Sequence, residues 1–274
     1  MIIAGLGRAG CQIAELFRPH SKTYKILFFD ENIGIKPQEN VEDYDDKPIK
    51  FKSKSLEGHS EGILFVCGAG KVAGASLRVL EALRALQMTV VYIVPDLEFS
   101  SREQRMRIRV HYGILQEYAR SGLIREMILI SNKSLLEWVG SGPISRYYEK
   151  VNYFIYSTFQ NLNYSKNVKQ DFAELHELKE VSRISTIGYA PFEGGEEKLF
   201  FPLDNITETR YIINIDEEDL DNNEEIIPRC QQIVRENKAK ERETSFAIWK
   251  NGEGENHYYV RHYTHFIQED SRQI

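Results

Sequence analysis

Three glycines near the start of the chain, Gly5, Gly7 and Gly10, lie in the stretch IIAGLGRAGCQIAEL. Their spacing matches the GxGxxG pattern of a turn between a buried strand and a helix. Glycine accepts positive φ angles and lets a ligand approach the backbone, while the N–H groups of a helix N-terminus attract anions. The turn is therefore a candidate phosphate site, with a purely structural tight turn as the alternative. Its candidate binding residues are Gly5, Gly7, Arg8, Ala9, Gly10, Cys11 and Gln12.

A second glycine cluster, GAGKVAGAS, also follows an apolar strand and opens a helical stretch. Two such turns on neighbouring strands can hold two parts of one phosphate chain, whereas a dinucleotide-binding dehydrogenase needs only one. A Walker-type loop would require Ser or Thr after the lysine, where this chain has Val72. The ammonium of Lys71 is a candidate partner for a phosphate oxygen, and the alternative is a surface lysine. The candidate residues here are Gly68, Ala69, Gly70, Lys71, Val72, Ala73 and Gly74.

Alternating strands and helices must position these turns. Short apolar runs rich in β-branched and aromatic residues predict buried strands at 25–30, 62–68, 89–95 and 126–132. Helical spacing of apolar residues predicts helices at 74–87 and 101–122, and the basic run 102–109 is expected to be a solvated helix face. Such alternation predicts a mainly parallel sheet that binds ligands at the carboxyl ends of its strands.

The second half of the chain has a different pattern. The run 144–162 predicts a long central helix, and later segments predict a helix at 223–238 and strands at 183–190, 210–216, 244–251 and 257–268. Residues 35–60 are interpreted as a long loop. The acidic run 216–225 is interpreted as a solvated loop, because it lacks the glycine and the spacing of a calcium loop.

The expected fold class is therefore α/β. It combines a Rossmann-like parallel-sheet nucleotide-binding domain at 1–142, a central helix and acidic loop at 143–170, and a smaller α+β C-terminal domain with a mixed sheet at 171–274.

Composition narrows the class of protein further. The chain has 274 residues with 42% hydrophobic content, enough for one large or two small domains with packed cores. Its three separated cysteines predict neither disulfides nor a zinc site, and we expect no protein-bound metal and a cytoplasmic location. No apolar run approaches the roughly 20 residues of a bilayer span, so no membrane association is expected. The net charge of -6 disfavours nucleic acid binding except through an adaptor.

Six segments, taken in order, resemble the tubulin and FtsZ superfamily. GRAGCQI resembles the first nucleotide loop of tubulins, and GAGKVAGAS occupies the place of the GGGTGTG signature. Downstream, IVPDLEFSSREQRM is similar to the strand and Phe-Glu-Phe segment before an arginine-rich helix, and LISNKSLLEWVG to the PNxxLL region of FtsZ. YYEKVNYFIYSTFQNL resembles the helix with the guanine-binding asparagine, and DFAEL the acidic loop with its following helix. The resemblance spans roughly residues 2–190.

The resemblance implies a site for GTP or GDP, with Mg²⁺ beside the phosphates. Asn152 would pair with the guanine edge and Tyr148, four residues earlier on the same helix face, would stack on the base. Asn132 would contact the sugar or base, and Gln12 would lie close to the phosphates. Asp30 follows the second predicted strand, where it would face the ribose in this interpretation and equally in a dehydrogenase.

The chain also departs from the family. The second glycine turn lacks both threonines of GGGTGTG, and β-branched Val72 resists the positive φ that a glycine would supply. Residues 40–60 lack the glycine-rich third loop that senses the γ-phosphate in FtsZ. Asp171 and Glu174 match the two carboxylates that the family presents to the neighbouring subunit's nucleotide. A helical start would place both on one face, and a helix N-terminus decorated with acids is the alternative.

Three functions fit the sequence. The first is a compact tubulin/FtsZ-like protein, in size suited to a phage or plasmid, that binds guanine nucleotide and assembles head to tail with slow or lost GTP hydrolysis. The second is a non-hydrolysing structural or regulatory protein of the same fold that acts as an adaptor or cap. The third is a Rossmann-type oxidoreductase, which the downstream resemblances disfavour.

Overall fold

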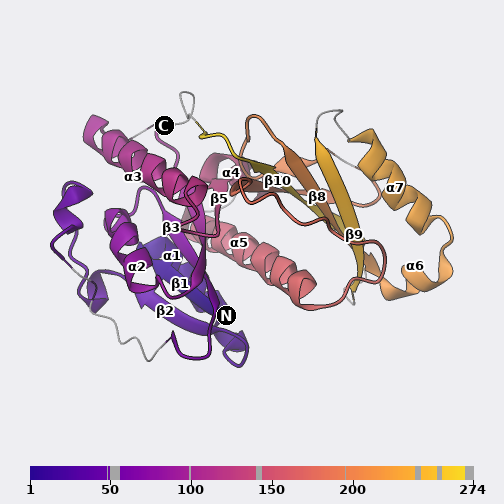
Figure 1. Ribbon diagram of the computed structural model, residues 1–274, viewed down its shortest axis with the longest axis horizontal. Helices are drawn as coiled ribbons and strands as arrows, with labels where there is room; N and C mark the ends of the chain where they lie inside the picture. The colour runs from indigo at the N-terminus through magenta and orange to yellow at the C-terminus, as the bar shows by residue number, and fades with distance from the viewer. Residues whose placement is uncertain are drawn as a thin grey trace. The chain divides into compact units, whose positions relative to one another are not determined.

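The computed structural model describes residues 1–47, 49, 56–98, 100–139, 144–194, 196–237, 242–251 and 255–268. The chain divides into two compact units (Figure 1). Unit 1 comprises Met1–Ser157 with Ile267–Ile274, and unit 2 comprises Thr158–Phe266. The division falls inside the longest helix, α5 (Ile144–Asn167).

Unit 1 contains the parallel sheet that the alternating pattern predicts. Its strands run in the order β2-β1-β3-β4-β5, and each neighbouring pair is parallel. The strand bounds are β1 (Ile2–Leu6), β2 (Lys25–Phe29), β3 (Glu61–Cys67), β4 (Gln87–Val94) and β5 (Glu126–Ser131). Most of their side chains are buried, as expected for strands covered on both faces.

Helices connect these strands, and their bounds are α1 (Gly7–Leu16), α2 (Ser76–Ala82), α3 (Arg102–Arg120) and α4 (Asn132–Val139). The N-terminus of α3 is fixed by a capping box, in which Ser101 and Gln104 satisfy one another's backbone N–H groups. The helix predicted at 74–87 is shorter than expected. It ends at Ala82 because β4 begins at Gln87, where Gln87 pairs with Glu61 of β3.

Close backbone contact holds α1 against the sheet. A Cβ atom added at Gly5 would lie 2.3 Å from the carbonyl oxygen of Gly10, and one added at Gly10 would lie 2.2 Å from that of Phe65 in β3. No side chain fits at either position while the helix keeps this distance from the strands. These two glycines therefore have a packing role that is independent of any ligand.

Unit 2 contains a mixed sheet, as predicted. Strand β10 is antiparallel to β6 and β8, β8 is parallel to β9, and the short β7 pairs with β6. The bounds are β6 (Ile184–Pro191), β7 (Lys198–Leu199), β8 (Glu208–Asp216), β9 (Glu243–Asn251) and β10 (His257–Thr264), with helices α6 (Glu217–Asn222) and α7 (Ile226–Glu236). Ile226, Cys230 and Ile233 of α7 are buried in one apolar cluster with residues of β8, β9 and β10.

The acidic run 216–225 corrects the sequence-based interpretation, because it forms helix α6 rather than a loop. The Asp216 carboxylate accepts a hydrogen bond from the backbone N–H of Glu218 at 3.0 Å and caps the helix. Glu217, Glu218 and Asp219 occupy the first turn, where negative charge interacts favourably with the helix dipole. The clustered acids thus stabilise a helix start. Over the described residues, no helix combines the length and apolar character that crossing a membrane requires.

Two glycine-to-alanine substitutions in helices should have opposite effects. Gly10→Ala places its Cβ against a backbone oxygen that cannot move alone, so we expect the free energy of unfolding to fall by about 2 kcal/mol. Gly113→Ala in α3 meets nothing within 4 Å and should raise it by about 1 kcal/mol through helix propensity. Urea unfolding of both variants measures these changes, and equal effects would contradict the packing role of Gly10.

Candidate functional site

The first glycine turn leads directly from β1 into α1. Leu6 is extended, with φ −113° and ψ 126°, and Gly7 turns the chain with a φ of +68°. No side chain caps the first N–H groups of α1, and its first turn contains no acidic residue. These N–H groups therefore remain suited to an anionic ligand, as the sequence predicted.

The second glycine turn lies beside the first. A Cβ atom added at Gly7 would be 3.3 Å from Cγ2 of Val72, which is buried and has a φ of −109°. The N–H groups of Gly68 and Ala73 donate to backbone oxygens within 3.0 Å, so the turn uses part of its own hydrogen-bonding capacity. Lys71 is exposed at this turn.

A pocket is present at the second glycine turn. Besides Gly68–Lys71 its lining includes Gln38, Tyr44, Gln104, Arg107 and His111. Arg107 of α3 donates from Nη1 to the carbonyl oxygen of Gln38 at 3.3 Å, and the hydroxyl of Tyr44 accepts from the Gln38 N–H at 3.1 Å. Two cationic side chains, Lys71 and Arg107, therefore border one concave site.

The described part of the predicted long loop packs against this turn. Val41 and Tyr44 are buried, and a Cβ atom at Gly74 would lie 3.0 Å from the Tyr44 ring. Arg78 of α2 pairs with Asp45 at 2.7 Å. This segment thus covers the second glycine turn although it lacks the glycine-rich sequence of the FtsZ third loop.

Asn152 and Gln12 contact one another. The Asn152 side-chain amide donates from Nδ2 to Oε1 of Gln12 at 3.1 Å. Asn152 is buried at 7% exposure in α5, whereas Gln12 is exposed in α1. Tyr156 strengthens the contact between the two helices, because its ring meets Phe17 edge-on at a centroid distance of 4.8 Å. One predicted base-binding residue therefore lies beside one predicted phosphate-site residue.

The other predicted nucleotide residues follow different strands and helices of unit 1. Asn132 opens α4 at the carboxyl end of β5. Tyr148 is 61% exposed on α5 and its ring contacts that of Tyr147. The Asp30 carboxylate follows β2 and accepts from the N–H and Nδ2 of Asn32, at 2.9 and 3.2 Å, so it closes a turn. Because β1, β3 and β4 lie between β2 and β5, Asp30 and Asn132 are separated by about 19 Å.

Cys11 lies at the first turn and its thiol donates to the Gly5 carbonyl oxygen at 3.3 Å. Burial raises the pKa of the Cys11 thiol to about 11. The side chain is therefore neutral at physiological pH and adds no negative charge beside the candidate phosphate site.

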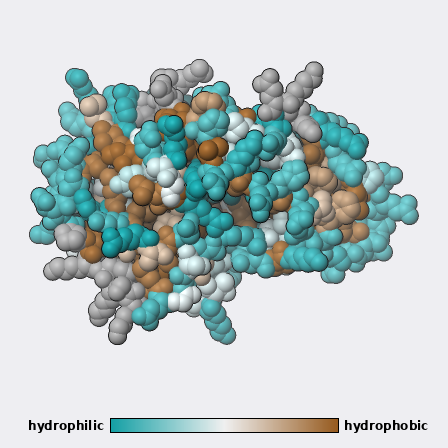
Figure 2. Space-filling view, in the orientation of Figure 1, coloured by the Kyte–Doolittle hydropathy of each residue, from teal (hydrophilic) through white to brown (hydrophobic). Residues whose placement is uncertain are grey.

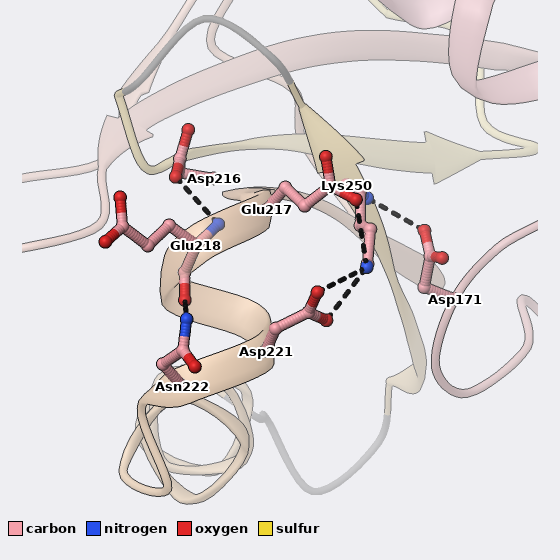
Figure 3. A network of polar contacts seen from close by, with 7 residues as sticks. All are labelled: Asp171, Asp216, Glu217, Glu218, Asp221, Asn222 and Lys250. Atoms are coloured by element: carbon pink, nitrogen blue, oxygen red, sulfur yellow. Dashed lines mark hydrogen bonds and ion pairs between the residues drawn. The ribbon is translucent and has the colours of Figure 1, made fainter.

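In unit 2, Asp171 is held against β9. Its N–H donates to the Ile248 carbonyl oxygen at 2.9 Å, and its carboxylate accepts from the Lys250 N–H at 2.8 Å. The Lys250 ammonium pairs with Asp221 at 2.8 Å and Glu217 at 3.4 Å in α6 (Figure 3). Lys250 therefore joins the Asp171 segment to the acidic helix.

The helix expected to begin at Asp171 is absent, because no helix forms between 168 and 179. Phe172 instead forms an antiparallel bridge with Ile248, and Ala173 has a φ of +57°. Asp171 and Glu174 consequently do not share a helix face, which corrects that part of the prediction. Glu174 is exposed.

Sequence reasoning missed the buried residues beneath the second turn. His111 of α3 is buried and hydrogen-bonds the Ser76 hydroxyl at the start of α2. Burial lowers the pKa of His111 to about 4. The helical spacing of α3 placed His111 near apolar residues, but only the packing of two helices identifies Ser76 as its partner. No group of three or more His, Cys, Asp or Glu residues within the described chain is arranged to hold a metal ion.

Comparison with known proteins identifies the fold. No protein-family model and no curated protein sequence matches the chain. Solved structures match almost all of it. TubZ of Bacillus thuringiensis serovar israelensis, in a GTPγS-form protofilament, has a TM-score of 0.67 at 13% identity, covering 95% of this chain and 86% of that chain.

Two further matches are of similar quality. An empty FtsZ dimer from M. jannaschii gives a TM-score of 0.69 at 10% identity, with coverage of 96% and 88%. A GTPγS-bound protofilament of CetZ2 from Haloferax volcanii gives 0.68 at 12% identity, with coverage of 100% and 95%. The chain therefore has the tubulin/FtsZ fold, and the α/β fold class expected from the sequence is confirmed.

The buried His111 should make stability depend on pH. The folded protein keeps the imidazole neutral down to about pH 4, whereas the unfolded chain protonates it below about 6.5, so acid favours unfolding. Stability should fall as pH decreases through this window, by up to about 1.4 kcal/mol per pH unit from this group. Urea unfolding from pH 7.5 to 4.5 should show a shallower dependence for His111→Gln, and parallel curves would refute the assignment.

Proposed function

We propose that this chain, which has the tubulin/FtsZ fold, binds a guanine nucleotide and assembles head to tail into filaments, with slow or lost GTP hydrolysis. The contact between Gln12 and Asn152, beside two adjoining glycine turns, is the observation that carries this proposal. It joins a candidate base-binding residue to a candidate phosphate-binding residue at one site.

The phosphates would be held by unit 1. The uncapped N–H groups of α1 and the exposed Lys71 ammonium provide positive potential from two adjoining turns. Gln12 offers a side-chain amide, while the turn formed by Val72 and its neighbours commits several N–H groups internally. The described residues offer no protein cage for a metal, so Mg²⁺ would be held chiefly by phosphate oxygens and water. It would neutralise phosphate charge.

The base would be recognised from α5. The Asn152 amide carries both donors and an acceptor and can match the guanine edge once it exchanges its contact with Gln12. The exposed Tyr148 ring is available for stacking on the base. Asn132 lies at the carboxyl end of β5 and would contact the base or sugar. Asp30 follows β2, which three strands separate from β5, so its proposed ribose contact is the weakest of this set.

Assembly is proposed because the similar TubZ and CetZ2 structures are protofilaments. A heterologous contact that does not close produces an open filament. Asp171 and Glu174 would then orient water at the nucleotide of the next copy. Hydrolysis would be slow, because the Asp171 carboxylate already accepts a backbone hydrogen bond and the second glycine turn lacks threonine hydroxyls. We propose a cytoplasmic location, with nucleic acid reached only through an adaptor.

The guanine site can be tested with Asn152→Ala. Losing the amide should weaken binding of fluorescent GTP and GDP about tenfold or more and remove the preference over ATP, because guanine loses its edge contact. Fluorescence titration in magnesium measures the dissociation constants. Asn163→Ala is the matched control, since this other asparagine of α5 is equally buried at 7% exposure and should leave binding unchanged. Equal affinities for all three nucleotides in the unmodified protein would contradict the proposal.

Hydrolysis can be tested with Asp171→Asn. The amide oxygen still accepts from the Lys250 N–H, but the carboxylate charge is lost. We expect GTP binding to persist and phosphate release in assembled protein to fall at least about tenfold. Glu177→Gln, an exposed acid in the same segment, is the control and should release phosphate normally. If the unmodified protein binds GTP but releases no phosphate, the non-hydrolysing adaptor or cap becomes the better description, which the altered second glycine turn favours.

A further inference from the structure

We propose that the exposed N-terminal face of α3 in one copy binds the acidic segment 216–225 of the next copy. The proposal rests on the head-to-tail assembly proposed above and names a contact that holds it together. It commits to one occupant, a second copy of this chain.

The face of α3 combines unpaired charge with apolar side chains. Within the described residues Arg102 and Arg105 are exposed and have no ion-pair partner. Met106 and Val110 lie on the same helix face, at 55% and 38% exposure. Arginine and methionine are enriched in protein interfaces, where an apolar centre is bordered by charge. Over its whole length α3 contains five arginines and two glutamates, so the helix is basic in an acidic protein.

The same N-terminal turns of α3 border the candidate nucleotide site with their opposite face. Gln104 and Arg107, from the same turns of α3, line the pocket beside Lys71. A partner that covers Arg102 and Arg105 would therefore contact the helix that borders the second glycine turn.

The segment 216–225 supplies the complementary charge. It contains seven acids, of which Glu217 and Asp221 pair with Lys250 while Asp216 and Asp219 accept hydrogen bonds within unit 2. Glu218, Glu224 and Glu225 are exposed, and the Glu218 carboxylate extends away from Lys250 in Figure 3. Hydrophilic residues surround the part of unit 2 that carries α6 (Figure 2). Lys250 alone does not neutralise the seven acids of segment 216–225, so most of their negative charge remains available to a partner.

Asp171 links this acidic surface to the proposed reaction. Lys250 binds the Asp171 carboxylate through its backbone N–H and the α6 acids through its ammonium. A copy that presents Asp171 to its neighbour's nucleotide would therefore also bring α6 toward that neighbour. Helix α3 borders the neighbour's second glycine turn through Gln104 and Arg107.

The charge distribution of the whole chain favours the same pairing. Of the 35 Lys and Arg residues, 22 lie in unit 1 and 13 in unit 2; of the 41 Asp and Glu residues, 20 lie in unit 1 and 21 in unit 2. Unit 1 is slightly basic and unit 2 strongly acidic. Attraction between unlike units and repulsion between two copies of unit 2 both favour a heterologous contact over a symmetric dimer.

Complementary charge reversals test the pairing. The basic-face variant carries Arg102→Glu with Arg105→Glu, and the acidic-segment variant carries Glu218→Lys with Glu224→Lys. None of these four side chains has a bonded partner within the described residues, so the fold should persist. The control carries Lys22→Glu with Arg84→Glu. Both residues are exposed and precede β2 and β4, so they lie near the amino ends of the strands, whereas the glycine turns follow the carboxyl ends.

Sedimentation and light scattering with GTP, at low and high salt, measure the critical concentration for assembly. Each variant alone should raise it about tenfold, whereas the control should match the unmodified protein. An equimolar mixture of the two variants should recover assembly. The arginines of the acidic-segment variant can bind the unchanged acids of the basic-face variant, and the new glutamates of the basic-face variant can bind the new lysines of the acidic-segment variant. A chain with all four reversals should also recover.

The results separate the proposals. Normal assembly by either variant, or failure of both the mixture and the fourfold variant, would overturn the α3 contact while leaving the filament function intact. If the unmodified protein and the control bind GTP but never assemble, the head-to-tail function fails and this contact fails with it. Fluorescent GTP titration of every variant reports nucleotide binding separately, and all should bind alike.

Discussion

The contact of α1 with β1 and β3 is the constraint on which the candidate site depends. Gly5 and Gly10 let helix and strand backbones meet where a single methyl group would separate them. This contact fixes where the N-terminus of α1 points, and it places Gln12, one turn further on, against Asn152 of α5. The turn and the asparagine are far apart in sequence, and the packing of α1 between the sheet and α5 makes them one site.

The two units differ in the charges that they carry. In unit 1 the helix N-terminus, Lys71 and Arg107 provide positive potential. In unit 2, Asp171 and α6 are tied together through Lys250, so the acids form one surface instead of a scattered set. The chain thus carries a positively charged surface in unit 1 and an acidic surface in unit 2.

The sequence predicted the strands well, because β-branched runs between turns leave few alternatives, and β3, β4 and β5 lie within two residues of their expected bounds. The sequence-based prediction was wrong where contacts between residues far apart in the chain determine the secondary structure. Phe172 pairs with Ile248 and prevents a helix, while Asp216 caps one where a loop was expected. Resemblance to a family identified Asn152 and Gln12 separately. No local sequence pattern predicts the hydrogen bond from Arg107 to the carbonyl oxygen of Gln38, because Gln38 lies in an irregular segment.

The two glycine turns differ in the substitutions that they can accept. At Gly5 and Gly10 the obstructing atoms belong to the backbone, which cannot move without displacing a helix or strand. At Gly68 and Gly74 the nearest atoms belong to the side chains of Tyr92 and Tyr44, which can be replaced or rotated. Gly5 and Gly10 therefore cannot be substituted without loss of packing, even in a protein that no longer needs to bind nucleotide. At the second turn, a glycine can be substituted if the neighbouring tyrosine changes as well. Among proteins with this fold, we expect the glycines of the second turn to be substituted before Gly5 and Gly10 of the first.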